Sequence, residues 1–334
     1  SNMSQVEFPV LDLEPFFNGK ENADVMLANQ LKEVCETIGF FFLKNHQISQ
    51  SIIDDMFAKT RAFHDLSMDE KLAISINKNQ RGYIKPGATL VSHSTYNKNT
   101  KYDSNETLVF ATDYASDDEF VKAGKRFYGE NQWPTNMPEL KPAVQEFMSE
   151  IEQLGKKLLP IWALALGLKP DFFEPYFHKP HNYLRLAHYP PVPELGENEF
   201  GLGPHADTGF MTFLPQADVE GLEVLLTDGS WIRPPRMDDA ILVNTGQFLE
   251  RWTNEKFRAS PHRVIPPKNR HRFSIAAFIN PSFEPVCHPI ETCVSDANPA
   301  KYPSQSYWDF YNWYMVNTYP HYEEFDAPKE ASSN

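Results

Sequence analysis

Gly203-Pro-His-Ala-Asp-Thr-Gly209 is the stretch that decides the fold, because it places a histidine and a carboxylate two residues apart. On an extended backbone, residues i and i+2 point to the same face. Their Cα atoms then lie roughly 6.5 Å apart, at about 3.3 Å per residue. His205 and Asp207 could therefore share one metal ion. Taken alone, however, this pair is more often a structural hydrogen bond than a metal site.

A third ligand is available in Ser260-Pro-His262-Arg-Val264, at the start of a predicted strand. Two histidines and one carboxylate, with the remaining coordination positions open, form the facial triad of non-haem iron(II) oxygenases. His178 and His181 form a competing pair, but they flank a proline in a connecting segment without a third ligand nearby. We therefore expect both of them at the surface.

The segment Arg272-Phe-Ser-Ile-Ala-Ala-Phe278 alternates as a strand does, so Arg272 and Ser274 share one face, which we expect to be a barrel interior. A buried guanidinium is costly unless an anion meets it, and a carboxylate with a hydroxyl beside it is a suitable partner. The alternative is a buried acid of the protein itself. By the same alternation Arg185 shares a face with Tyr189. We expect Arg185 to meet either a polar or anionic substrate group or a structural ion pair.

The rest of the chain divides into a helical first half and a second half of short strands. Helical spacing predicts helices over 22–38, 49–63 and 135–167, with a strand at 40–43 and a Ser67-x-x-Glu70 capping box opening a shorter helix. After Pro180, the predicted strands are 183–189, 210–214, 222–226, 231–233, 240–244, 262–265 and 272–279. Asp228-Gly229 predicts a hairpin turn. Many short strands favour a sandwich or barrel.

Composition narrows the possible partners. The chain has 334 residues, 41% of them hydrophobic, and 31 basic against 45 acidic residues give a net charge of −14. Such an acidic protein is repelled by nucleic acid and anionic lipid. No apolar run is long enough to span a bilayer. Only three cysteines are present, which favours a reduced, cytoplasmic protein. We expect a small-molecule substrate, because the predicted helices and the C-terminal segment could close over a pocket.

Four further segments accompany these motifs: Ile38–His46, Arg81-Gly-Tyr83, Leu184–Pro191 and Trp252-Thr-Asn254. Together they resemble the iron(II)/2-oxoglutarate-dependent oxygenases of the isopenicillin N synthase-like family, over nearly the whole chain. The resemblance implies a mainly β fold with α: a double-stranded β-helix (jelly-roll) core flanked by N-terminal helices and a C-terminal helix. The chain would form one domain, 1–334. Within it, 1–180 would be mostly helical with barrel-associated strands, 181–290 the core, and 291–334 a C-terminal helical segment.

The resemblance also implies Fe(II) and 2-oxoglutarate as cofactors. The residues that match functional positions are three iron ligands, His205, Asp207 and His262, and three 2-oxoglutarate contacts, Arg272, Ser274 and Tyr189. The implied reaction uses dioxygen to oxidise a C–H bond of a small molecule, by hydroxylation, desaturation, or ring formation or expansion, and releases succinate and CO2. Gly246-Gln247 stands where the family commonly has Gly-Asp, which affects local hydrogen bonding.

Substrate contacts are less well defined by the sequence. Tyr83, Phe248, Tyr307 and Tyr311 are candidates beside Arg185, although packing is favoured for each of them. Two alternatives to the main function stay open at this point. One is an oxidase of the same fold that draws all electrons from its substrate without 2-oxoglutarate. The other is a non-catalytic jelly-roll module that binds zinc, another ligand or nothing.

Overall fold

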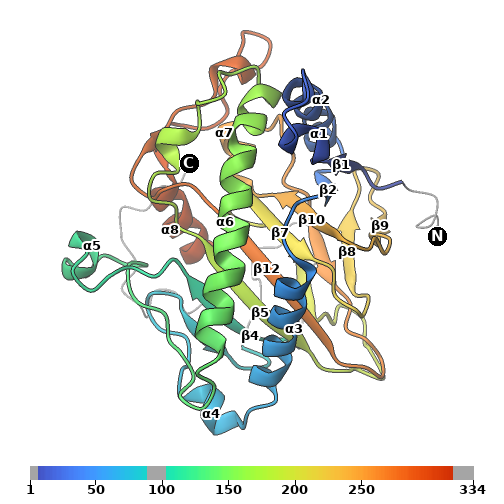
Figure 1. Ribbon diagram of the computed structural model, residues 1–334, viewed down its shortest axis with the longest axis vertical. Helices are drawn as coiled ribbons and strands as arrows, with labels where there is room; N and C mark the ends of the chain where they lie inside the picture. Colours follow the sequence, from blue (N-terminus) through green and yellow to red (C-terminus); the bar gives the residue numbers. More distant parts are fainter. Residues whose placement is uncertain (1–6, 89–102, 319–334) are drawn as a thin grey trace.

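A computed structural model of the chain describes residues 7–88 and 103–318 and has a jelly-roll core, as predicted (Figure 1). The larger, eight-stranded sheet has, in spatial order, β1 Val10–Asp12, β2 Phe40–Lys44, β10 Ala240–Thr245, β7 Met211–Pro215, β12 Arg272–Ile279, β5 Tyr183–Tyr189, β4 Glu106–Ala111 and β3 Gly82–Ile84. The four-stranded sheet has β6 Leu202–His205, β11 His262–Val264, β8 Leu222–Leu225 and β9 Trp231–Ile232. A small two-stranded sheet joins β13 Val286–Cys287 to β14 Gln305–Ser306.

Strands β5 and β12 run antiparallel in the middle of the larger sheet, with Tyr189 opposite Arg272. Along β12 the side chains alternate between the buried Phe273, Ile275, Ala277 and Ile279 and the half-buried Ser274, Ala276 and Phe278. This alternation is the period of two on which the strand prediction rests. One face of β12 thus packs against the helices, and the other is left for a cavity.

The smaller sheet carries the two segments that hold the histidines of the predicted metal site. In it, β11 pairs with both β6 and β8, and β9 follows β8 through the hairpin at Asp228-Gly229. Gly229 has a φ of 89°, the left-handed conformation that glycine adopts without steric cost. The sequence did not predict β6 as a strand. It contains Gly203 and Pro204, both of which are unfavourable in strands.

Helices α2 Ala23–Glu36, α3 Gln50–His64 and α6 Leu140–Ala165 cover one face of the larger sheet (Figure 1). The other helices are α1 Glu14–Phe17, α4 Met68–Leu72, α5 Glu119–Lys122, α7 Gln247–Trp252 and α8 Tyr307–Thr318, with short 3-10 turns at Glu174–Tyr176 and Glu291–Cys293. The capping box of Ser67 and Glu70 opens α4 as predicted. Helix α6 begins later than expected, because Met137 precedes Pro138 and is disfavoured in α conformation.

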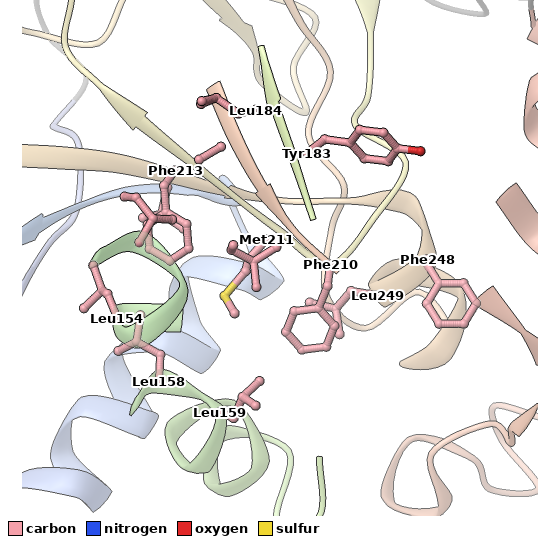
Figure 2. Packing of buried hydrophobic residues seen from close by; sticks show 14 of the residues in the cluster. Leu154, Leu158, Leu159, Tyr183, Leu184, Phe210, Met211, Phe213, Phe248 and Leu249 are labelled. Atoms are coloured by element: carbon pink, nitrogen blue, oxygen red, sulfur yellow. The ribbon is translucent and has the colours of Figure 1, made fainter. Parts of the chain in front are cut away.

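The core lies between α6 and the larger sheet. Figure 2 shows Leu154 and Leu158 of α6 directed toward Met211 and Phe213 of β7. A Cβ on Gly155 would come within 3.2 Å of Met211 and Ile279 side chains, so the glycine allows the helix to approach the sheet closely. Burying each large apolar side chain contributes about 1.5 to 3 kcal/mol, so this contact stabilises the packing of α6 on the sheet.

None of the helices within the described ranges is long and apolar enough to cross a membrane. The three cysteines are buried and free. Part of the predicted C-terminal helical segment is α8, and residues 319–334 lie outside the described residues.

Candidate active site

Three predicted ligands meet at one end of the smaller sheet. His205 ends β6 and His262 begins β11, and the two are direct partners across the ladder. Their ring centroids are 4.4 Å apart. The Nε2 atoms of His205 and His262 lie 3.5 and 3.2 Å from Oδ1 of Asp207. Three ligand atoms so close together can surround one ion.

Backbone carbonyls fix the orientation of both histidine rings. Nδ1 of His205 lies 2.8 Å from the carbonyl oxygen of Gly203, and Nδ1 of His262 lies 3.2 Å from that of Ser260. A carbonyl only accepts hydrogen bonds, so each Nδ1 carries the proton and each Nε2 keeps its lone pair for a metal. Phe40 packs edge-on against the His262 ring, with centroids 5.4 Å apart.

Two residues that the sequence analysis missed hold the carboxylate of Asp207. The Thr212 hydroxyl and the Asn244 amide each donate a hydrogen bond of 2.7 Å to Oδ2. Oδ1 is thereby left to face the histidines. Thr212 lies on β7 and Asn244 on β10, where they are register partners. Both are polar residues in mainly apolar strands, and that was the signal that could have found them.

The loop after Asp207 passes close to α7. The backbone N–H of Gln247 donates to the Asp207 carbonyl at 2.7 Å, and its side-chain amide donates to the Ala206 carbonyl at 3.0 Å. A Cβ on Gly246 would lie 2.3 Å from the carbonyl oxygen of Gly209, so only glycine fits there. Gln247 thus supplies the local hydrogen bonds at the position where the sequence departs from the family pattern.

The three groups are strongly coupled electrostatically. Burial raises the pKa of Asp207, but the charges and hydrogen bonds of the two histidines outweigh it and lower the pKa well below its usual range. Burial and the neighbouring His262 lower the pKa of His205. For His262 burial is outweighed by Asp207, and the pKa is raised. The site therefore presents an ionised carboxylate beside two imidazoles, which suits a divalent cation.

A cavity of about 640 Å³ opens in front of these ligands. Its walls include the inner-face residues of two neighbouring strands: Tyr183, Arg185, Ala187 and Tyr189 of β5, and Arg272, Ser274, Ala276 and Phe278 of β12. The predicted 2-oxoglutarate contacts and the predicted metal ligands thus face one space, as their strand alternation requires. The volume is ample for a co-substrate and a small second molecule.

Arg272 is the most informative residue of this cavity. Its side chain is buried, its Nε donates to the Val219 carbonyl at 2.9 Å, and its Nη1 has no hydrogen-bond partner. Its guanidinium lies 5.2 Å from the ring centroid of Tyr189. Within the described part of the chain no carboxylate forms an ion pair with Arg272, so the alternative of a buried protein acid is wrong there. A buried, unpaired guanidinium fits the carboxylate of a small molecule.

The tentative substrate contacts separate into two groups. Arg185 and Tyr311 line the cavity. Tyr83, Phe248 and Tyr307 do not: each is at most 2% exposed and packs against other aromatic rings. For these three the packing interpretation describes the structure, and the expectation that they line the cavity is wrong. The aromatic residues of α8 contribute both to the core and to the cavity. Tyr307 packs in the core, while Tyr311 and Tyr314 line the cavity.

His178 is exposed as predicted, but the prediction for His181 is wrong. His181 is fully buried, and its Nδ1 lies 2.9 Å from the hydroxyl of Tyr114. Burial lowers its pKa well below the ordinary value, and the nearby Arg81 adds to this. The expectation failed because the hydrogen-bond partner lies far away in the sequence.

A second group of two histidines and a carboxylate lies on the helical side of the larger sheet. Nδ1 of His64 is 3.3 Å from Glu106 Oε1, and Nδ1 of His188 is 2.7 Å from Glu106 Oε2. Unlike Asp207, Glu106 also receives the ammonium of Lys71 at 2.7 Å and the hydroxyl of Tyr83 at 2.5 Å. No sequence motif indicated this group, because its three members come from α3, β4 and β5.

Two family models match the chain. Residues 8–136 match the model described as the N-terminal part of non-haem dioxygenases in morphine synthesis, and residues 180–281 match the 2OG-Fe(II) oxygenase superfamily. The first covers the early helices together with strands β1 to β4, and the second covers most of the jelly-roll core with all three candidate metal ligands.

Individual relatives agree with these models. A 2-oxoglutarate-Fe(II) type oxidoreductase, hxnY, of Emericella nidulans is 30% identical and covers 88% of this chain and 85% of its own. Kihadalactone A synthase LFS of Citrus sinensis is 32% identical and covers 93% of each chain. The crystal structure of a full-length Neurospora crassa protein with alpha-KG and 5-formyluracil superimposes with a TM-score of 0.77 at 25% identity, over 91% of this chain and 94% of that one.

Proposed function

This chain belongs to the 2-oxoglutarate–Fe(II) oxygenase superfamily, and from this premise we propose which of its residues perform the reaction. It is an Fe(II)/2-oxoglutarate-dependent oxygenase. We assign His205, Asp207 and His262 as iron ligands, and Arg272 with Ser274 and Tyr189 as the 2-oxoglutarate site. The substrate is a small organic molecule that is oxidised at a C–H bond.

The observation that carries this assignment is the buried Arg272 guanidinium in the same cavity as the His205–Asp207–His262 cluster. Its free Nη1 and the Ser274 hydroxyl would donate to the distal carboxylate of 2-oxoglutarate. Tyr189 lies opposite Arg272 on the neighbouring strand, and its ring would contact the bound carboxylate from one side. The residues present therefore fit both iron(II) and 2-oxoglutarate.

When bound, iron(II) and 2-oxoglutarate supply the activation of dioxygen and the oxidising power, with release of succinate and CO2. The protein itself contributes by positioning the metal ligands and the co-substrate. Thr212 and Asn244 hold one oxygen of Asp207, so the other stays directed at the ligand histidines. The carbonyls of Gly203 and Ser260 hold the histidine tautomers. Arg272 and Ser274 fix the co-substrate, and the apolar cavity wall excludes water from the reacting groups.

The direct test is an anaerobic titration of metal-free protein with iron(II) and then 2-oxoglutarate, followed by the weak visible absorption band of the chelate. We expect the band to form in the wild type. Arg272→Ala should weaken 2-oxoglutarate binding by about 30-fold or more, because removing one partner of a buried charge pair costs about 2 to 5 kcal/mol. Arg270→Ala is the matched control, since Arg270 is an exposed arginine two residues away.

The same titration tests the two alternatives from the sequence. Iron binding without the band would identify an oxidase that does not use 2-oxoglutarate. Absence of iron(II) binding would identify a non-catalytic module and overturn the assignment. Family membership and the unpaired Arg272 both support the 2-oxoglutarate-dependent reaction instead.

Three further predictions about partners and location go with this proposal. Dioxygen is the second co-substrate, which oxygen uptake coupled to 2-oxoglutarate consumption would test. Nucleic acid and membranes are not partners, given the net charge of −14. A cytoplasmic location, expected from the sparse cysteines, is tested by cell fractionation.

A further inference from the structure

Four arginines line the cavity, and they differ in what neutralises them. Arg233 lies 3.3 Å from both Glu220 and Glu223. Arg236 lies 3.3 Å from Asp238. Arg272 and Arg185 form no ion pair within 4.0 Å with any carboxylate of the described residues. Because Arg272 is assigned to 2-oxoglutarate, Arg185 is left as a second cation in the cavity without an assigned anion.

The strands next to Arg185 offer no counter-charge. Its register partners are Val109 on β4 and Ala276 on β12, and the next inward residue along its own strand is Ala187. Each of these side chains is apolar and short. A half-buried guanidinium surrounded in this way loses hydration without gaining a protein partner. The small neighbours also leave room in front of it.

Asp103 is the acid that acts on Arg185 electrostatically, and it is a weak partner. Its Oδ1 already accepts the backbone N–H of Gly203 at 2.9 Å, and the side chain is 1% exposed. Burial raises the pKa of Asp103 to about 7 against the smaller opposing effects of Gly203 and Arg185. Asp103 thus carries only part of a charge near neutral pH and does not satisfy the arginine.

The two arginines without carboxylate partners stand at different places along the cavity floor. Arg185 is opposite Ala276, which is four residues further along β12 than Arg272. At about 3.3 Å per residue, this separates the two positions by roughly 13 Å. A single 2-oxoglutarate molecule held at Arg272 and at the metal therefore leaves Arg185 to a second molecule. The lining contributed by β3, β4, β5, β12 and α8 is mainly apolar or aromatic, with Thr107 of β4 as a polar exception; it includes Ile84, Val109, Tyr183, Phe278, Tyr311 and Met315.

We propose that Arg185 binds the acid group of the substrate, and that the substrates are small organic acids with a mainly apolar body. This inference rests on the proposed function, because it assumes that Arg272 holds 2-oxoglutarate. The acid group is bound by the Arg185 guanidinium, and the apolar body lies along the aromatic and aliphatic wall. The carbon to be oxidised is then a position of that body directed toward His205, Asp207 and His262.

The test uses pairs of compounds that differ only in charge: phenylacetate, cinnamate and octanoate, each beside its primary amide. Binding is measured as the rise in unfolding temperature of protein loaded with Mn(II), which does not turn over, and 2-oxoglutarate. Stimulation of 2-oxoglutarate consumption in the Fe(II) enzyme is the second readout. We expect the wild type to bind at least one acid about tenfold or more tightly than its amide, as a hydrogen-bonded charge pair provides.

Two substitutions at one position and a matched control complete the experiment. Arg185→Met should abolish the preference for acids, and Arg185→Lys should keep part of it, because the positive charge is retained. Arg236→Met removes a cavity arginine that has its own carboxylate and should leave the preference unchanged. All three variants should bind 2-oxoglutarate within about twofold of the wild type.

The outcomes separate this inference from the proposed function. If the wild type does not bind 2-oxoglutarate, the proposed function fails. If 2-oxoglutarate binds normally but no acid is preferred over its amide, or the preference survives in Arg185→Met, the inference alone is overturned. A large loss of 2-oxoglutarate affinity in Arg185→Met would also overturn it, because Arg185 would then belong to the co-substrate site.

Discussion

The cluster of His205, Asp207 and His262 and the cluster of His64, Glu106 and His188 contain the same kinds of side chain, yet they differ in every property that matters for a metal. Both bring two imidazoles and one carboxylate together. The first, which we call the cavity cluster, opens onto the 640 Å³ cavity. The second, which we call the buried cluster, lies on the opposite side of the larger sheet, next to α3 and α4.

The difference lies in how each carboxylate is neutralised. In the cavity cluster, neutral donors hold one oxygen of Asp207, and no lysine or arginine of the described chain pairs with it. In the buried cluster, the Lys71 ammonium and the Tyr83 hydroxyl already donate hydrogen bonds to the Glu106 carboxylate. A cation entering there would meet another cation within a few ångströms. A metal site is therefore defined by ligand atoms with free lone pairs and an open coordination face, and not by residue types alone.

The strongest test of this comparison is Asp207→Ala. We expect it to abolish stoichiometric iron binding and 2-oxoglutarate consumption, because the only anionic ligand of the cavity cluster is removed. The intact buried cluster should not retain iron in its place. Metal analysis after gel filtration and an assay of 2-oxoglutarate consumption measure both effects. Asp218→Ala is the control, since Asp218 is an exposed acid at the same cavity.

Iron that remains bound at full stoichiometry in Asp207→Ala would contradict the distinction between the clusters. The unfolding temperature should fall moderately relative to the wild type without metal, because the buried Thr212 and Asn244 donors lose their acceptor. Loss of cooperative unfolding would mean that Asp207 is required for the fold itself.

The second prediction concerns the buried cluster, where we expect an effect on stability without an effect on metal. Glu106→Gln leaves the Lys71 ammonium, which is 5% exposed, without its counter-charge. Breaking a buried pair in this way costs about 3 to 5 kcal/mol. Denaturant unfolding measures this loss, and iron content should not change.

Two controls sharpen that result. Lys71→Met combined with Glu106→Gln removes both charges and should recover part of the stability. Asp55→Asn breaks the exposed pair of Lys59 and Asp55, whose atoms are also 2.7 Å apart, and should cost less than about 1 kcal/mol. Loss of iron in Glu106→Gln would show that the buried cluster contributes to metal binding after all.

The sequence predicted the cavity cluster and not the buried one, for a physical reason. His205 and Asp207 are two residues apart, and Arg272 and Ser274 share a strand, so local periodicity alone places each pair on one face. The same periodicity gives the bounds of β5 and β12. Strand β4 was missed because it begins with Glu106 and Thr107. Glu106 is buried only because partners arrive from α3, α4 and β5.

Other residues were predicted wrongly or missed for the same reason, because their partners are distant in the sequence. The hydroxyl that makes a buried His181 tolerable belongs to Tyr114. Tyr83 alternates with the cavity residue Ile84 on β3 and therefore faces the helices, where its hydroxyl donates to Glu106. Thr212 and Asn244 gain their role from strand pairing between β7 and β10. In each case the sequence specifies the polar group, and only tertiary contact specifies its partner.

A third, smaller effect on iron affinity is expected from the residues that hold the Asp207 carboxylate in place. Asn244→Ala removes one of the two bonds to Asp207 Oδ2 and should lower iron affinity by about 10- to 100-fold, the range typical of outer-shell partners of metal ligands. Competition with a metal chelator measures this affinity. Asn182→Ala removes a comparably buried amide that donates to Glu152 at 2.6 Å, and it should leave iron affinity unchanged. Equal losses in both variants would assign the effect to general destabilisation.

The smallest predicted effect is a pH dependence that belongs to the buried cluster. Burial raises the pKa of Glu106, but hydrogen bonds from His188, His64, Lys71 and Tyr83 outweigh it and hold the pKa well below its ordinary value of 4.5. The stability that this carboxylate provides is thus fully present above about pH 4.5 and is lost as the pH falls toward its folded pKa. The free energy of unfolding falls by about 1.4 kcal/mol per pH unit over the range in which Glu106 is protonated in the unfolded chain but not in the folded one.

Comparison with Glu106→Gln isolates this contribution, because Asp207 and the other carboxylates titrate in both proteins and their effects cancel. The difference in unfolding free energy between wild type and Glu106→Gln should be constant from about pH 7 to pH 5.5 and should narrow by about 1 kcal/mol between pH 4.5 and pH 3.5. A difference that stays constant through this range would mean that Glu106 has an ordinary pKa in the folded chain. Its contacts with Lys71 and the two histidines would then not neutralise it, and the buried cluster would lose the property that distinguishes it from the cavity cluster.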